Sequence, residues 1–140
     1  MKKFRDAGFN EMVEAKMSTL FAPIDPGVYA DALQALTEEY QPVGAEVQLV
    51  ERLAHLSCRI RICFYLQSEL LNAGIKATRA GGDRQAMRPF HKVSAYHSRL
   101  FRQFEECLRR LKRLVDDRRR RDALAAEAFS QYKLATSVVQ

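Results

Sequence analysis

Apolar residues between Phe90 and Leu114 recur at alternating steps of three and four. This is the spacing of a helix that buries one seam against a partner helix. The seam residues are Phe90, Val93, His97, Leu100, Phe104, Cys107, Leu111 and Leu114. Because Pro89 is tolerated in the first turn of a helix, the pattern predicts a long helix over about residues 89–115 or beyond.

A second long helix is predicted over about residues 45–72. Its apolar stripe is widened on one side, and the full set is Leu49, Val50, Leu53, Leu56, Ile60, Cys63, Phe64, Leu70 and Leu71. The stretch Asn72-Ala73-Gly74 is typical of a helix C-terminus. The following loop, with Gly81-Gly82, is long enough to reverse the chain. We therefore expect the two long helices to form an antiparallel pair.

Shorter helices are expected around this pair. Asp25 is a good N-cap and Pro26 suits a first helical position, so a helix should run from there to about Tyr40 and end at the Gln41-Pro42-Val43-Gly44 break. Residues 1–22 form an N-terminal arm or a weak helix. Residues 116–140 form a C-terminal helical extension that continues or bends at Asp116–Asp122, where the apolar repeat is interrupted without Gly or Pro. No alternating strand pattern is found, so we predict a single all-α domain over residues 1–140.

Composition agrees with a globular protein, since 47% of the 140 residues are apolar and 29% are charged. No apolar run has the roughly 18 residues of a membrane span, and no apolar segment follows the basic start as in a secretory signal. Cys58, Cys63 and Cys107 form a sparse, odd set on apolar helix faces. They are typical of reduced core cysteines, so we expect a cytoplasmic protein with no membrane partner.

The net charge of +6 is unevenly distributed. Residues 84–121 contain thirteen Lys/Arg and four Asp/Glu, a balance of +9, and eleven of the thirteen are Arg. The remainder contains ten Lys/Arg and thirteen Asp/Glu, a balance of −3. Such concentrated charge attracts a polyanion or an acidic partner, although a long surface helix also uses charge simply to stay hydrated.

Residue patterns of known catalytic and metal sites are missing. There is no G-x-S-x-G, no Gly-rich phosphate loop and no H-E-x-x-H. His55, Cys58 and Cys63 are the one cluster of soft ligands, but Cys58 and Cys63 point to different faces of a helix. Cys107 has arginines nearby that favour a thiolate, but its seam position indicates burial. We therefore expect no catalytic residues, no metal and no cofactor.

Two binding functions remain. In the first, a non-enzymatic accessory protein, within a larger nucleoprotein complex, binds the phosphate backbone of RNA or DNA through its Arg-rich helix. The candidate nucleic-acid-binding residues are Arg99, Arg102, Arg109, Arg110, Arg113, Arg118, Arg119, Arg120 and Arg121. In the second, the wide apolar faces of the long helices form a protein–protein interaction module that self-associates or binds an acidic partner.

Several motifs also resemble those of a widespread group of small bacterial helical proteins. They are Asp25-Pro26-x-x-Tyr29, Glu39-Tyr40-x-Pro42, Leu49-Val50-Glu51-Arg52-Leu53-Ala54 and Tyr96-x-x-Arg99-Leu100-x-Arg102. The resemblance covers about residues 20–115. It implies a helical fold and a bacterial source, and it implies no particular activity.

Overall fold

The computed structural model describes residues 7–82 and 84–139, and every regular element in them is helical. The elements are α1 (Ala7–Phe21), α2 (Pro26–Tyr40), α3 (Ala45–Arg79), the 3₁₀ turn η1 (Arg84–Met87) and α4 (Arg88–Val139). The predicted all-α class is confirmed.

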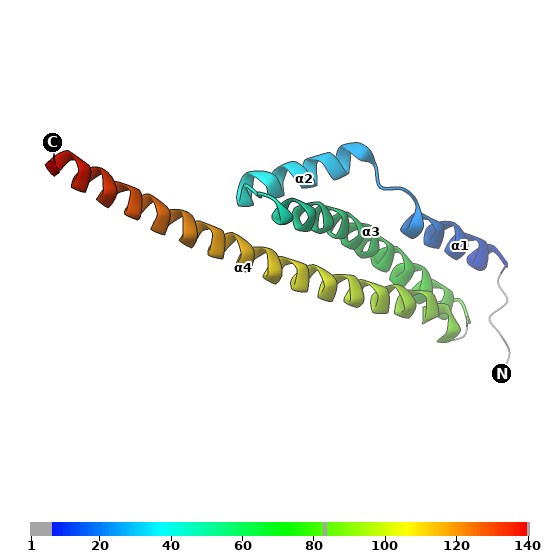
Figure 1. Ribbon diagram of the computed structural model, residues 1–140. Coiled ribbons are helices and arrows are strands. Elements are labelled where there is room, and N and C mark those ends of the chain that lie inside the picture. Colours follow the sequence, from blue (N-terminus) through cyan, green and yellow to red (C-terminus); the bar gives the residue numbers. More distant parts are fainter. Residues whose placement is uncertain (1–6, 83, 140) are drawn as a thin grey trace.

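The two long helices α3 and α4 form the centre of the fold, and α1 and α2 pack along α3 (Figure 1). Glu46 near the start of α3 contacts Arg118, whereas Gln67, further along α3, contacts Ser94. Residue numbers therefore fall along α4 as they rise along α3, so the two helices run in opposite directions.

The core has two clusters of buried residues along the α3–α4 seam. One cluster, which includes Leu20, Leu66 and Val93, is closed by α1. The other, which includes Leu53 and Leu111, is closed by α2. Each short helix therefore covers its own part of the groove between the long ones.

Local signals set the bounds of α2 as predicted. The Asp25 side chain accepts a hydrogen bond from the Gly27 N–H at 2.7 Å, which satisfies an amide that the first helical turn leaves unpaired. At the other end, Gln41 has a left-handed φ of 45°, and its N–H donates to the Thr37 carbonyl at 2.8 Å. This αL residue turns the chain towards α3.

The predicted stop of the second long helix at Gly74 is wrong, because α3 continues to Arg79. Gly74 is buried inside the helix. A Cβ atom there would lie 2.9 Å from the Ala86 carbonyl oxygen and 2.6 Å from the Met87 Sδ. Glycine is needed here for the close approach of η1 and not for a helix end.

α4 is a single helix of 52 residues, and the Asp116–Asp122 stretch neither ends nor bends it (Figure 1). Its first part packs against α3, and its second part extends well past the start of α3. All side chains described from Arg119 to Val138 are exposed. We call residues 119–139 the extension.

Candidate nucleic-acid interface

Four of the nine predicted arginines form a line along α4 on the face opposite to its buried seam. They are Arg102, Arg109, Arg113 and Arg120, and all four are exposed. At about 100° per residue they fall within a sector of about 40°, and the line is about 27 Å long. We call these four residues the arginine line.

Other exposed arginines flank this line. Arg99, Arg110 and Arg121 lie on one side of it, and Arg119 lies on the other. None of these eight arginines forms an ion pair with a carboxylate among residues 7–82 and 84–139. Glu105, Glu106, Asp116 and Asp117 lie on the same part of the helix and lower its positive charge, but the arginines outnumber them.

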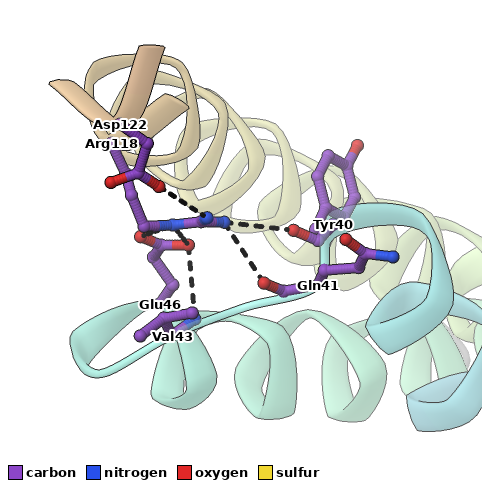
Figure 2. A network of polar contacts seen from close by, with 6 residues as sticks. All are labelled: Tyr40, Gln41, Val43, Glu46, Arg118 and Asp122. Atoms are coloured by element: carbon purple, nitrogen blue, oxygen red, sulfur yellow. Dashed lines mark hydrogen bonds and ion pairs between the residues drawn. The ribbon is translucent and has the colours of Figure 1, made fainter. Parts of the chain in front are cut away.

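Arg118 differs from the other eight, because its guanidinium is engaged inside the protein (Figure 2). Its Nε donates to both carboxylate oxygens of Glu46, at 3.1 and 3.0 Å. One terminal nitrogen donates to the carbonyls of Tyr40 and Gln41, at 3.5 and 3.2 Å, and the other lies 3.9 Å from Asp122. We therefore remove Arg118 from the candidate interface.

Glu46 is the buried acid that makes this arrangement stable. Its side chain is only 6% exposed, and it also accepts from the Val43 N–H at 3.4 Å. The hydrogen bond from Arg118 lowers the pKa of Glu46 against the opposing effect of burial, and the same bond raises the pKa of Arg118. Both groups are therefore charged in the folded protein. They join the α2–α3 turn to α4 where the extension begins.

Aromatic rings accompany some of the arginines. Arg99 lies over the ring of Tyr96, at 5.9 Å from its centroid, and Tyr96 also contacts Phe21. Phe101 is 46% exposed and stacks on His97. Tyr96 is half-buried against the core, so Phe101 is the more exposed of the two rings.

The structure also brings in residues that the sequence pattern did not assign to the surface. Arg52 of α3 meets Arg110 at a hollow of about 140 Å³, which Gln103 and Glu106 also line. Phe64, predicted as part of the apolar stripe, is 59% exposed. The buried stripe of α3 is therefore narrower at Phe64 than the sequence pattern predicts.

Burial determines the protonation state of two of the cysteine thiols. Burial raises the pKa of Cys63 to about 11, and it also raises that of Cys107 despite the nearby Arg52 and Arg110. Both thiols are therefore protonated at neutral pH. In the described part of the chain, no three His, Cys, Asp or Glu side chains are grouped so as to hold a metal ion.

Comparison of this chain with family models, with curated proteins and with solved structures gives no match. The resemblance to small bacterial helical proteins therefore stays a prediction. None of the described helices has an apolar stretch long enough to cross a membrane.

Proposed function

We propose that this protein binds the phosphate backbone of a nucleic acid through the exposed arginines of α4, as a non-enzymatic accessory subunit of a nucleoprotein complex. The observation that carries the proposal is the set of eight exposed arginines without carboxylate partners in the described structure. Guanidinium groups pair bidentately with phosphate oxygens, so arginine suits this role better than lysine.

The length of the arginine line supports a backbone contact. Its roughly 27 Å corresponds to about eight phosphates along one strand of a duplex, at 3.4 Å per phosphate. Contacts of this kind neutralise charge without reading bases, so we expect weak sequence preference. With about five phosphates neutralised, the logarithm of the affinity should fall with the logarithm of salt concentration with a slope of −4 to −5.

The test compares two double variants of equal charge change. Arg109→Glu with Arg113→Glu alters the arginine line, whereas Arg61→Glu with Arg79→Glu alters two exposed arginines of α3. We expect the first to weaken binding of single-stranded and duplex DNA and RNA by roughly 100-fold and to reduce the salt slope by about 2. The second should weaken binding only a few-fold.

Fluorescence anisotropy over a salt series measures both quantities, and far-UV circular dichroism checks that each variant is folded. If the wild-type protein binds neither single-stranded nor duplex DNA or RNA at low salt, the proposal is wrong. Equal losses in the two double variants would show attraction by net charge rather than by this surface.

The second candidate function, a helical protein–protein interaction module, is favoured by a different observation. The extension carries large apolar side chains, including Leu124, Phe129 and Tyr132, each 58–66% exposed. Large apolar side chains that are exposed to this extent on a helix are normally covered by the surface of another protein.

A further inference from the structure

The face of α4 that packs against α3 continues into the extension without a change of register. From Leu111 onwards the positions advance by alternating steps of four and three, through Leu111, Val115, Arg118, Asp122, Ala125, Phe129, Tyr132 and Thr136. Leu111 and Val115 are buried against α3, at 0% and 2% exposure. From Asp122 onwards the same seam is uncovered, because α3 begins at Ala45, level with the region of Arg118 (Figure 1).

Apart from the charged Asp122 at its start, the uncovered part of the seam consists of Ala125, Phe129, Tyr132 and Thr136, which carry no charge. Phe129 and Tyr132 are 58% and 66% exposed, and Lys133 lies over the Phe129 ring at 5.1 Å. Between residues 123 and 139, Glu127 and Lys133 are the two charged residues. One charge of each sign gives no basis for selecting a strongly acidic or a strongly basic partner.

We infer that two copies of this chain associate through their extensions, as an antiparallel helix pair with Phe129 and Tyr132 of both copies at its centre. The interface is independent of nucleic-acid binding. In this register the two-fold axis lies between residues 130 and 131, so that Phe129 of each copy faces Tyr132 of the other. On either side of this aromatic centre, Ala125 of one copy faces Thr136 of the other. The second copy's helix continues along α4 where α3 leaves off, so the pair prolongs a seam that is already formed within the chain.

Charge selects the antiparallel orientation. A parallel pair would put Arg119, Arg120 and Arg121 of one copy beside the same three residues of the other. In the antiparallel pair the two arginine groups are about 30 Å apart along the axis at 1.5 Å per residue. This is about three screening lengths at an ionic strength of 0.1 M, so their repulsion is small.

The area is sufficient for a weak dimer. Aromatic side chains of this size have roughly 200 Å² each, so the exposed parts of the four rings remove roughly 500 Å² from water. Small residues and methylene groups along about 26 Å of helix bring the total near the roughly 1,000 Å² of a specific interface. We therefore expect a dimer that dissociates on dilution.

The first test uses matched charge variants in the extension. Phe129→Asp puts a charge into the centre of the seam. Leu134→Asp puts the same charge on the opposite side of the helix, at a residue of similar exposure (67%). In sedimentation experiments on nuclease-treated protein, we expect wild type and Leu134→Asp to dimerise with rising concentration and Phe129→Asp to stay monomeric. Both residues lie outside the core, so the unfolding midpoints should agree and exclude misfolding as the cause.

The second test measures orientation. Nitroxide labels at Ser130 and, in a separate sample, at Ala123 report the distance between equivalent positions of the two copies. In the antiparallel pair, equivalent residues separate along the helix axis by about 3 Å for each residue from the two-fold axis. With the two helix axes about 9 Å apart, the predicted distance is therefore roughly 15 Å longer at residue 123 than at residue 130. Equal distances would overturn the antiparallel arrangement.

Two further outcomes overturn the inference. If the wild-type chain is monomeric at the highest attainable concentration, the inference is wrong and the exposed seam binds a different protein. If the Phe129→Asp and Leu134→Asp variants have the same dimer dissociation constant, the two copies do not associate through the seam. Neither outcome changes the salt-dependent binding expected of the arginine line, so the two proposals fail separately.

Discussion

The parts of α4 before and after Arg118 have the same helical register but opposite environments. Before Arg118, the seam residues Val93 and Leu111 are fully buried by α3. After it, Phe129 on the same face is 58% exposed. The apolar pattern therefore identifies the face that is suited to burial, whereas the length of the partner helix decides how much of that face is covered.

The two parts also keep their helical structure for different reasons. The packed part is stabilised by the burial of apolar side chains between helices. The extension has no such packing against the described residues, and its helicity depends on intrinsic propensity, to which five alanines between residues 123 and 135 contribute. Isolated helices of this length are only marginally stable in water.

The largest expected difference between the two parts is in the effect of truncating a leucine. Leu111→Ala removes a fully buried side chain and leaves a cavity, so we expect a loss of about 3 kcal/mol in the free energy of unfolding. Leu124→Ala, at a residue that is 60% exposed, should change it by less than about 0.5 kcal/mol. Equilibrium denaturation with urea measures both. Equal losses would show that the extension is packed within the monomer.

The junction between the two parts depends on the buried Glu46–Arg118 pair. Glu46→Gln removes the negative charge and leaves the guanidinium without its main partner, so we expect the melting temperature at pH 7 to fall by roughly 5 °C. The control is Asp122→Asn, which alters a 71% exposed group 3.9 Å from the same guanidinium and should have almost no effect.

The pH dependence of the same variant has a definite sign. The pKa of Glu46 is lowered in the folded protein from its ordinary value of 4.5, so the unfolded chain binds this proton more readily. The stability advantage of wild type over Glu46→Gln should be complete above about pH 4.5 and should disappear as the pH falls through the lowered pKa. Thermal melts between pH 7 and pH 3 check this, and an advantage that does not shrink at all over this range would contradict it.

The smallest expected effect is that of a glycine in the extension. Ala123→Gly should weaken the local helix by about 1 kcal/mol and reduce the helical circular dichroism signal slightly, without moving the unfolding midpoint of the packed part. Ala54→Gly makes the same change at a fully buried position of α3 and should lower that midpoint. A shift of the midpoint by Ala123→Gly would show that the two parts unfold together.

Local chemistry explains which elements were predictable from the sequence. The start of α2 at Asp25-Pro26 and its end after Tyr40 depend on capping and on a breaker within a few residues, and both were predicted. The end of α3 was not predicted. A glycine that ends a helix and a glycine that allows close packing of a neighbouring backbone look the same in the sequence. Only the contact of Gly74 with Ala86 and Met87 separates the two.

For the candidate interface, the helical position of Arg118 could have been recognised from the sequence. A run of four arginines looks uniform when only charge is counted. Arg118 lies three residues after the buried Val115, on the seam register, and this position separates it from Arg119, Arg120 and Arg121. Its partner Glu46 is distant in the sequence by 72 residues, so the ion pair itself had no local signal.

The length of α4 has a mechanical consequence. Its 52 residues span about 78 Å, and no Gly or Pro follows Pro89 to give it a kink. A helix of this kind bends only gently, so while the extension is helical its far end lies roughly 30 Å beyond the start of α3. A rotation of the packed body, formed by α1, α2, α3 and the first part of α4, therefore moves the far end of the extension through a wide arc.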